Sequence, residues 1–574
     1  MNRNTVSGII LTLLFVNMLS MAFNIQLVRA EPKTWYVDDD GGADFTRIQD
    51  AIYAASPGDT IYVYPGLYFE NLIVRKGNLT IVGESKSNTI IDGQGNVVIS
   101  IYKNRVSVRG FTLLNGGQSW YIIWGSVVLL DYAQYCNISD NIVSNSRRGI
   151  ASYRGRHNTI SGNTISDTNQ GVTLYYTLNE TVTGNVISNG VQYGSDPPYG
   201  VQVFRGSNNK VVANTAANIS YTGIRLTYAA RNIVSGNIAY NTSVGISADY
   251  TSSFNTIVGN NAFNNEIGIG IHGHSNNNTI ARNNASTNEK GIDVGDSNNN
   301  ILTLNNVRDN EYGIMLSLSS KNSVTGNNMT NNHAGIYLGH SSNNSIAENN
   351  IANNNYGVML AESSRNNIIQ NSIIANNRDG IWVVLFSNNN SIAKNSITAN
   401  NGHGVWLFDS SNNRIFHNNF VANTRQAFSK FTNAWDDGYP SGGNYWSDYE
   451  ETYPDAEEID NSGIWNIPYW IDENNQDNYP LIEPWTPLPR TIGELKTETE
   501  DLGSEGEIDN KGIVTSLIAK LNVAQKLVDS GKIDQAKTIL EAFIQQVQNL
   551  SGIHMTVEAA DILIESAEHI LSHL

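Results

Sequence analysis

Residues 255–300 read NTIVGNNAFNNEIGIGIHGHSNNNTIARNNASTNEKGIDVGDSNNN, and this stretch contains one repeat unit followed by the next. The motif N-x-[I/V]-x-x-N opens both units, as NTIVGN and then as NTIARN. A Gly-[Ile/Val] step also recurs, mostly every 22 to 24 residues, at Gly149, Gly171, Gly200, Gly223, Gly245, Gly268, Gly291, Gly313, Gly335, Gly357, Gly380 and Gly404. A period this short and regular predicts a solenoid, in which each unit forms one coil.

Within each unit, apolar residues stand at alternate positions, as in a strand with one buried face. Counted from the glycine, positions +1 and +3 are apolar, as in Ile269 and Ile271, whereas position +2 varies. The Ile or Val of the Asn motif is a second inward position, and an apolar residue two after the closing Asn is a third. Three short strands separated by Asn, Ser and Gly turns predict a right-handed parallel β-helix.

The asparagines fit this geometry. Asn-rich sequence is also typical of disordered, prion-like segments, but such segments have no strictly phased Ile and Val. Identical Asn side chains one coil apart, about 4.8 Å, can form a hydrogen-bonded ladder. Asn also tolerates the left-handed conformation that tight corners need. We therefore predict ordered Asn columns along a rod.

Composition limits the class of protein. A chain of 574 residues exceeds one compact core, but a solenoid can grow because each coil packs only on its neighbours. The net charge of −18 argues against nucleic acid as a partner. Cys136 is the single cysteine, so no intramolecular disulfide can form. We expect its thiol to be buried within a coil; intermolecular pairing is the alternative.

Residues 1–30 have the pattern of a signal peptide. Arg3 supplies the charged region, an apolar run follows, and Val28 and Ala30 predict cleavage before Glu31. An uncleaved membrane anchor is the alternative. We expect the protein to be secreted or to lie at the cell surface, with no membrane span after cleavage.

Residues 44–55 read DFTRIQDAIYAA and predict a short amphipathic helix, with Thr46 and Gln49 at capping-box spacing. This opening and the first strands resemble the N-terminal cap of pectin-methylesterase-like and other pectin-lyase-like β-helices. The repeats resemble the periplasmic copper-binding NosD-like family and the carbohydrate-binding and sugar-hydrolase (CASH) domain. The resemblance implies a β-helix over residues 31–430, and it implies fold more than activity.

Residues 431–484 are acidic and aromatic and are expected to close the rod. The stretch AWDDGYPSGGNYWSDY (434–449) resembles the closing segment of NosD-like β-helices, where an Asp/Gly-rich run suits Ca²⁺. Here that run reads DAEEIDNSGIWN (455–466) and departs from the family pattern. Calcium takes six to eight oxygens, and the resemblance implies the candidate ligands Asp455, Glu457, Asp460, Asp472 and Asp477. A solvated acidic cap without metal is the alternative.

The C-terminal part changes period. Residues 485–510 read as a Pro-, Gly- and acid-rich linker, in part a short helix. Over 511–574 the apolar period becomes 3.6, which predicts a small all-α domain of three helices, the last N-capped by Thr556. The chain from about Arg490 to Leu574 resembles the FIMAH domain, which stands at the ends of secreted prokaryotic proteins. A helical bundle beside a secreted rod suggests attachment or contact with another protein.

Outward positions of neighbouring coils form columns, and aromatic and Arg residues collect in them. Exposed Tyr and Trp on a rigid sheet can stack on sugar rings, and Arg suits sugar carboxylates. We therefore expect a polysaccharide or cell-envelope glycan to contact Arg154, Tyr175, Arg205, Arg225, Tyr228, Tyr337, Trp382 and Trp406.

The middle coils add His and acidic residues at outward positions, namely Asp249, His272, Asp293 and Asp296. These residues suit general acid–base catalysis on a polysaccharide. A metal site formed by His272, His274 and His340 is a second interpretation, and a solvated face is the third. The D-P-H-D motif of alginate epimerases and the catalytic set of polygalacturonases are absent from the sequence.

The sequence thus predicts a secreted or surface β-helix that binds carbohydrate. A polysaccharide lyase, epimerase or hydrolase that uses the middle-coil cluster is one alternative. A structural surface protein or adhesin is the other.

Overall fold

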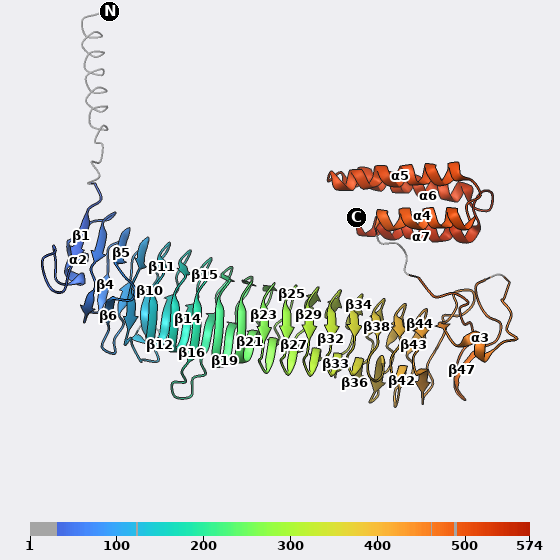
Figure 1. Ribbon diagram of the computed structural model, residues 1–574, viewed down its shortest axis with the longest axis horizontal. Helices are drawn as coiled ribbons and strands as arrows, with labels where there is room; N and C mark the ends of the chain where they lie inside the picture. The colour runs from blue at the N-terminus through green and yellow to red at the C-terminus, as the bar shows by residue number, and fades with distance from the viewer. Residues whose placement is uncertain (1–30, 122–123, 461, 487–490) are drawn as a thin grey trace, which may run out of the picture.

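The structure, a computed structural model, describes residues 31–121, 124–460, 462–486 and 491–574. The predicted signal peptide, residues 1–30, lies outside the described residues. Figure 1 shows a long rod of stacked coils, and the last part of the chain forms a group of helices.

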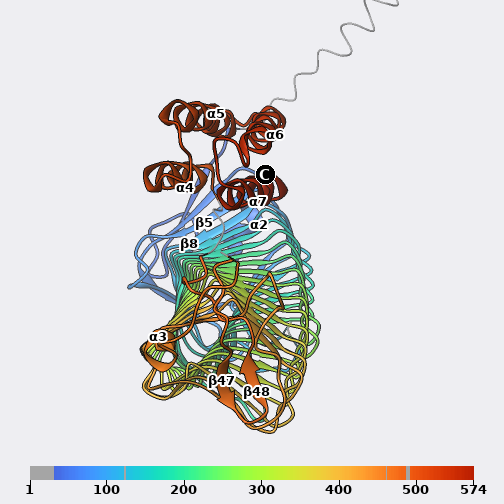
Figure 2. The ribbon, with the colours of Figure 1, turned by 90° about the vertical axis from the view of Figure 1, so that its right-hand side faces the viewer.

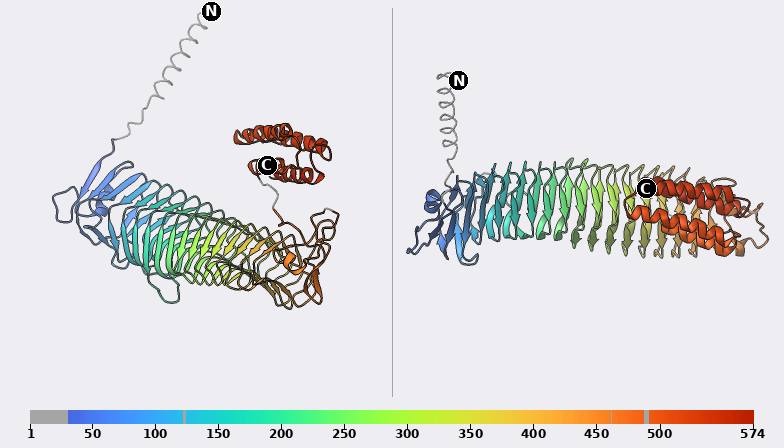
Figure 3. Two further views of the ribbon diagram at one scale, coloured as in Figure 1. Left: turned by 45° about the vertical axis from the view of Figure 1, so that its right-hand side comes forward. Right: turned by 90° about the horizontal axis from the view of Figure 1, so that it is seen from above.

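Each coil of the rod contributes three strands. In one coil these are β22 (Thr256–Val258), β23 (Asn261–Phe263) and β24 (Ile267–His272). They pair in parallel and in register with β25 (Thr279–Ala281), β26 (Asn284–Ser286) and β27 (Lys290–Gly295) of the next coil. Over the described residues the strands form a 17-stranded and a 29-stranded sheet. This arrangement confirms the right-handed parallel β-helix, which Figures 2 and 3 show along and across its axis.

The recurrent glycine is required because neighbouring coils approach closely at this point. A Cβ on Gly268 would lie 2.6 Å from the carbonyl oxygen of Gly291, and a Cβ on Gly291 would lie 2.7 Å from that of Gly313. Only glycine permits such an approach. The inward Ile257 and Ile269 are fully buried, so the core is a continuous stack of aliphatic side chains.

The predicted Asn ladders are present and have a direction. Asn255 Nδ2 donates to Asn278 Oδ1 (3.1 Å), and Asn260 Nδ2 donates to Asn283 Oδ1 (2.9 Å). Each acceptor oxygen also receives the backbone N–H of the same donor residue, at 2.9 Å. Every coil therefore donates to the next coil on its C-terminal side, and the last coil is left with donors that need acceptors.

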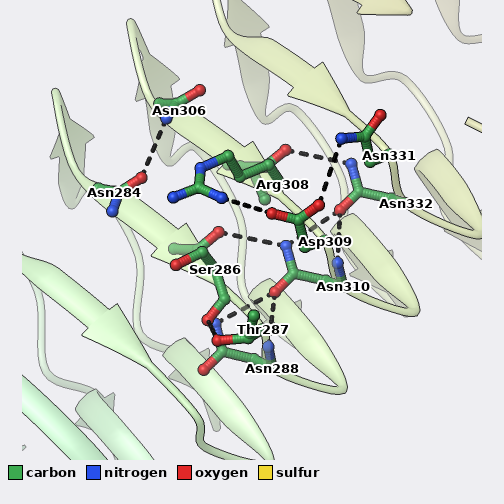
Figure 4. A network of polar contacts seen from close by, with 12 residues as sticks. Asn284, Ser286, Thr287, Asn288, Asn306, Arg308, Asp309, Asn310, Asn331 and Asn332 are labelled. Carbon is green, nitrogen blue, oxygen red and sulfur yellow. Dashed lines mark hydrogen bonds and ion pairs between the residues drawn. The ribbon is translucent and has the colours of Figure 1, made fainter. Parts of the chain in front are cut away.

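A third ladder follows the corner shown in Figure 4. Asn288 Nδ2 donates to Asn310 Oδ1 (3.2 Å), and Asn310 Nδ2 donates to Asn332 Oδ1 (3.0 Å). A more exposed row runs the opposite way, because Asn306 Nδ2 donates to Asn284 Oδ1 (3.0 Å). The ladders satisfy buried amides that would otherwise destabilise the corners.

The N-terminal helix α2 (Ile48–Ala54) covers the first coil, but the predicted capping box is wrong. Arg47 is the N-cap residue and makes no side-chain cap. Instead, the Glu70 carboxylate from a neighbouring strand connection accepts the N–H groups of Ile48 (2.8 Å) and Gln49 (3.0 Å). The carboxylate of Glu70, which is distant in sequence, therefore caps the helix in place of the predicted Thr46.

At the other end, β47 (Tyr469–Asp472) and β48 (Asn475–Asp477) form an antiparallel hairpin that terminates two ladders. Asn433 N donates to Asn475 Oδ1 (2.9 Å), and Asn444 N donates to Asp477 Oδ2 (2.7 Å). The short helix α3 (Tyr449–Thr452) lies in the same segment. The closing segment therefore supplies the acceptors that the directional ladders require.

The helical part begins earlier than predicted. It consists of α4 (Ile492–Glu505), α5 (Lys511–Asp529), α6 (Ile533–Leu550) and α7 (Val557–His573). Leu495 and Leu502 of α4 belong to the core of this domain, so the short helix expected within residues 485–510 is part of the helical domain rather than of a linker. Thr556 caps α7 as predicted, because its side chain accepts the Ala559 N–H. Within the described residues, no helix has the length and apolarity of a membrane span.

Candidate functional site

One outward face of the rod carries most of the predicted site residues. It is built by the 29-stranded sheet, whose strands here include β10 (Ser126–Asp131), β12 (Ile142–Tyr153), β14 (Thr164–Tyr175), β17 (Tyr199–Phe204), β19 (Thr215–Thr227), β21 (Ile238–Asp249), β24 and β27. Their parallel register places residues one period apart side by side (Figure 3). We call this surface the outer face.

The register sorts the predicted glycan contacts into two groups. Tyr175, Arg225, Tyr337, Trp382 and Trp406 lie on strands of the outer face. The other three, Arg154, Arg205 and Tyr228, follow the strands in left-handed turns, with φ of 52°, 51° and 52°. The predicted contacts therefore lie both on the outer face and in the turns that border it, which we call its rim.

Three of the four candidate catalytic residues converge. His272 Nε2 lies 3.2 Å from Asp293 Oδ2, and His272 Nδ1 lies 3.7 Å from Asp249 Oδ1. Arg225 Nε pairs with Asp249 at 3.0 Å, and Lys290 Nζ lies 3.4 Å from Asp293. A pocket of about 330 Å³ opens here, lined in part by Arg225, Asp249 and His272.

The charges of this cluster hold His272 in its protonated form. Burial alone would lower the pKa of His272, but hydrogen bonds and charge interactions with Asp249 and Asp293 raise it to about 9. Burial also opposes ionisation of Asp293, yet His272 and Lys290 lower its pKa below the ordinary value. At neutral pH the cluster is an ion-pair network whose imidazolium can donate protons but cannot act as a base.

The remaining candidates lie apart. Asp296 pairs with His274 at 3.2 Å in an exposed turn, and His340 pairs with Glu362 at 3.2 Å in another. His272, His274 and His340 therefore each face a different acid, and they do not form the proposed metal site.

A larger pocket, of about 650 Å³, lies on the outer face nearer the N-terminus, and the sequence analysis missed it. Its lining residues come from four successive coils and one loop: Trp120, Tyr121, Asp131, Tyr132, Arg148, Tyr153, Gln170, Thr173, Tyr175, Gln202 and Phe204. Only Tyr175 among them was a predicted contact. We call it the aromatic pocket.

Two insertions occur in the coils around the aromatic pocket, and the first of them lines it. Thr112 pairs with Ile142 and Val186 pairs with Thr215, so these two coils are longer than the usual period of the rod. The extra residues lie in segments 115–125 and 190–198; the second projects from the rod near β16 (Val186–Gly190) in Figure 1. The long interval between the repeat glycines Gly171 and Gly200 was the signal that could have located the second.

Two adjacent arginines hold these insertions. The Arg147 guanidinium lies 3.7 Å from the centre of the Trp120 ring and forms an ion pair with Asp196 of the second insertion. Arg148 donates to the Trp120 carbonyl (3.2 Å) and to Gln170 Oε1 (3.0 Å). The walls of the aromatic pocket are thus fixed by buried, directional contacts.

Asp131 is the unusual polar group of the aromatic pocket. Its Oδ1 atom is buried and has no hydrogen-bond partner in the described part of the chain. Burial raises its pKa above the ordinary value. A buried acceptor without a donor is costly in an isolated protein, and a ligand hydroxyl or amide could supply the missing hydrogen bond.

Aromatic rings also line the C-terminal part of the outer face. The Tyr356 and Trp382 rings stack at 5.3 Å, and Trp382 and Trp406 stack at 5.6 Å. Because each ring covers part of the next, this row is a continuous apolar strip. Trp382 Nε1 has no hydrogen-bond partner among the described residues.

The five candidate calcium ligands do not converge. Asp455, Glu457 and Asp460 are exposed. Asp472 instead accepts Asn475 Nδ2 at 3.0 Å, and Asp477 is fully buried at the end of an Asn ladder. The described residues therefore give no calcium cage in this segment, and two of the five carboxylates serve the ladders.

Comparison with protein families gives two matches. The sequence matches the family described as periplasmic copper-binding protein (NosD) over residues 52–195, 191–333 and 296–451, and the FIMAH domain over residues 492–572. Copper prefers imidazole and sulfur ligands. Within the described ranges, the only His, Cys, Asp or Glu group of three with converging ligand atoms is Asp38, Asp39 and Asp40, which offers carboxylates alone. These residues do not fit copper.

Solved structures with a similar fold include three carbohydrate-active proteins. The periplasmic alginate epimerase AlgG is 15% identical, with 49% of this chain and 77% of that chain covered and a TM-score of 0.32. The AlgE6 A-module of Azotobacter vinelandii, a mannuronan C-5 epimerase, is 15% identical, with coverage of 61% and 93% and a TM-score of 0.34. A mannuronic acid-specific polysaccharide family 6 lyase from human gut microbiota is 12% identical, with coverage of 63% and 86% and a TM-score of 0.38.

At these identities the likeness to solved structures concerns the β-helix fold alone. No curated protein matches the chain. The family match, by contrast, extends over more than half of the sequence and coincides with the coils of the rod. The chain therefore belongs to the NosD family and ends in a FIMAH domain.

Proposed function

We propose that this protein binds a polysaccharide along the outer face, with the aromatic pocket as its main contact. The observation that carries the proposal is the pocket of about 650 Å³, whose wall includes Trp120 and Tyr121 from an insertion that departs from the repeat. A regular rod does not need this insertion for stability. Concave sites with aromatic walls and a few polar groups are typical of ligand-binding sites.

The chemistry of the aromatic pocket suits sugar rings. Trp120, Tyr121 and Tyr132 are 58%, 68% and 55% exposed, so apolar ring surface is open to a ligand. Gln170 and Gln202 offer amides, and Asp131 offers an unpartnered oxygen. Side chains that repeat about every 4.8 Å along a rigid sheet can follow an extended polymer.

The test is binding of the chain from Glu31 to a panel of soluble polysaccharides, measured by calorimetry. We expect Trp120→Ala to weaken binding about tenfold or more, as for a central aromatic contact. Phe254→Ala is the matched control, because Phe254 is 56% exposed and lines neither pocket. Equal loss in both variants, or no binding to any polymer, would refute the proposal.

A second candidate function is catalysis on the bound polysaccharide, which the convergence of Asp249, His272 and Asp293 favours. Protonated His272 suits the role of a general acid. New products on incubation, lost in His272→Gln while binding persists, would support this role. If mass spectrometry finds the polymers unchanged, catalysis is excluded and binding remains as the proposed function.

We also propose that the protein works outside the cytoplasm, as expected for a family described as periplasmic. We propose in addition that the FIMAH domain contacts another protein. Capture of that partner by a chain that ends before α4 would contradict it.

A further inference from the structure

A row of alternating tyrosine and arginine side chains follows the rim of the outer face beside the aromatic pocket. It comprises Tyr132, Arg154, Tyr176, Arg205 and Tyr228, each from the same turn of successive coils. Arg154 Nη1 donates to Tyr132 OH, and Arg205 Nη1 donates to Tyr176 OH, both at 2.8 Å. We call this row the Tyr–Arg strip.

The tyrosine rings hold both guanidinium groups in place. The Arg154 guanidinium lies 5.5 Å from the ring centre of Tyr132 and 5.7 Å from that of Tyr176. The Arg205 guanidinium lies 5.6 Å from Tyr176 and 5.3 Å from Tyr228. Packing between rings reduces the side-chain entropy that binding would otherwise cost.

Neither arginine has an acidic partner. No ion pair among the described residues includes Arg154 or Arg205, although both are exposed. Farther along the same turn, the cationic candidates are paired, His274 with Asp296 and His340 with Glu362. In a chain with a net charge of −18, these two guanidinium groups place positive charge beside the pocket without a neutralising carboxylate in the described part of the chain.

The spacing of these cations suits a polymer. Arg154 and Arg205 stand two coils apart, which corresponds to about 10 Å. Each guanidinium has five N–H groups and uses one of them on a tyrosine hydroxyl. The remaining donors can form charge-assisted, bidentate hydrogen bonds with carboxylates. Tyr132 belongs to the strip and also lines the aromatic pocket, so the two surfaces are continuous.

We propose that the ligand is an acidic polysaccharide, whose sugar rings contact the aromatic pocket and whose carboxylates pair with Arg154 and Arg205. This inference rests on the proposed glycan binding and adds the charge of the ligand. Asp131 lies on the strand that precedes Tyr132, where it faces the pocket, and it can bond a sugar hydroxyl while the strip binds the acidic groups.

The test uses uronate polysaccharides, each paired with its carboxyl-reduced, uncharged form. Wild-type protein is expected to bind at least one acidic polymer about tenfold or more tightly than its reduced form. The double variant Arg154→Gln/Arg205→Gln is expected to lose that difference. Arg282→Gln is the matched control, because Arg282 is exposed, has a similar φ of 54° and lies on the opposite corner after β25.

The outcomes separate the two proposals. If the reduced polymers bind as tightly as the acidic ones, or if Arg282→Gln lowers binding as much as the double variant, the inference on charge is wrong while glycan binding stands. If no polymer binds in either form, glycan binding itself fails. Circular dichroism of the double variant verifies that the rod is intact.

Discussion

Glu180 occupies a ladder position that Asn holds in the coils on both sides. Asn158 Nδ2 and Ser152 Oγ donate to its Oε1 atom, but Oε2 is buried without a partner among the described residues. An Asn here would donate to Asn209 Oδ1, whereas a carboxylate cannot. Burial raises the pKa of Glu180 to about 7, although those two hydrogen bonds oppose the shift.

The presence of Glu instead of Asn at position 180 makes the stability of the rod pH-dependent. Folded Glu180 keeps its proton between pH 4.5 and about 7, where the unfolded chain has released it. The free energy of unfolding therefore falls as pH rises through this window, by roughly 3 kcal/mol at most. We expect Glu180→Asn to raise Tm at pH 8 and to change it little at pH 4. Thermal unfolding of Glu311→Asn, at an exposed position, is the control.

His272 gives a dependence of the same sign at higher pH. Its pKa is raised from 6.5 to about 9, so the stabilisation by its charge is complete below pH 6.5 and is lost as pH rises through 9. NMR titration should find the His272 ring protonated up to about pH 9, with His272→Gln giving the assignment. A midpoint near 6.5 would mean that the contacts with Asp249 and Asp293 do not persist in solution.

At the scale of elements, the hairpin of β47 and β48 explains one buried acid of the closing segment, Asp477. Asp477 accepts the Asn444 N–H (2.7 Å), the Trp446 Nε1–H (2.9 Å) and the Tyr479 N–H (3.1 Å). Donors converge on it because the ladders point toward this end of the rod. A carboxylate, which only accepts, suits the last position.

We therefore expect Asp477→Asn to destabilise the rod by about 1–3 kcal/mol, since an amide NH₂ would face donors. Asp455→Asn, at an exposed position of the same segment, should change stability by less than about 0.5 kcal/mol. Chemical denaturation measures both. An increase of Tm on adding Ca²⁺ that either variant abolishes would instead favour the calcium site implied by family resemblance.

The repeat predicted the coils because its signals are local. The spacing of Gly268 and Gly291 and the Asn motif define one coil without reference to distant residues. The aromatic pocket could not be found this way, because its shape depends on the contacts of Arg147 with Trp120 and Asp196 across two insertions. Helix α4 was expected only as a short helix beside a linker, because acidic residues surround its buried Leu495 and Leu502.

At the scale of the whole molecule, the rod and the helical domain have separate cores. The buried residues of the rod form one cluster up to Tyr449, and those of the helices form another from Ile492 onward. Removing residues 491–574 is therefore expected to leave glycan affinity and the unfolding of the rod unchanged. Calorimetry of the shortened chain checks both, and loss of glycan binding would assign that function to the FIMAH domain.

The regular register of the outer face places equivalent side chains of successive coils next to one another, so that they form long rows. The aromatic pocket, the Tyr–Arg strip, the ion-pair cluster around His272 and the Trp382–Trp406 strip follow one another along the same sheet. A polymer aligned with the rod could contact all of them, whereas a small ligand would need only one pocket.

The most direct measurement is a crystal structure of the chain from Glu31 with an acidic oligosaccharide selected from the panel. We predict a sugar ring in the aromatic pocket, against Trp120 and Tyr121, with a carboxylate on Arg154 or Arg205. An oligosaccharide bound to the helical domain or to another face of the rod would contradict it.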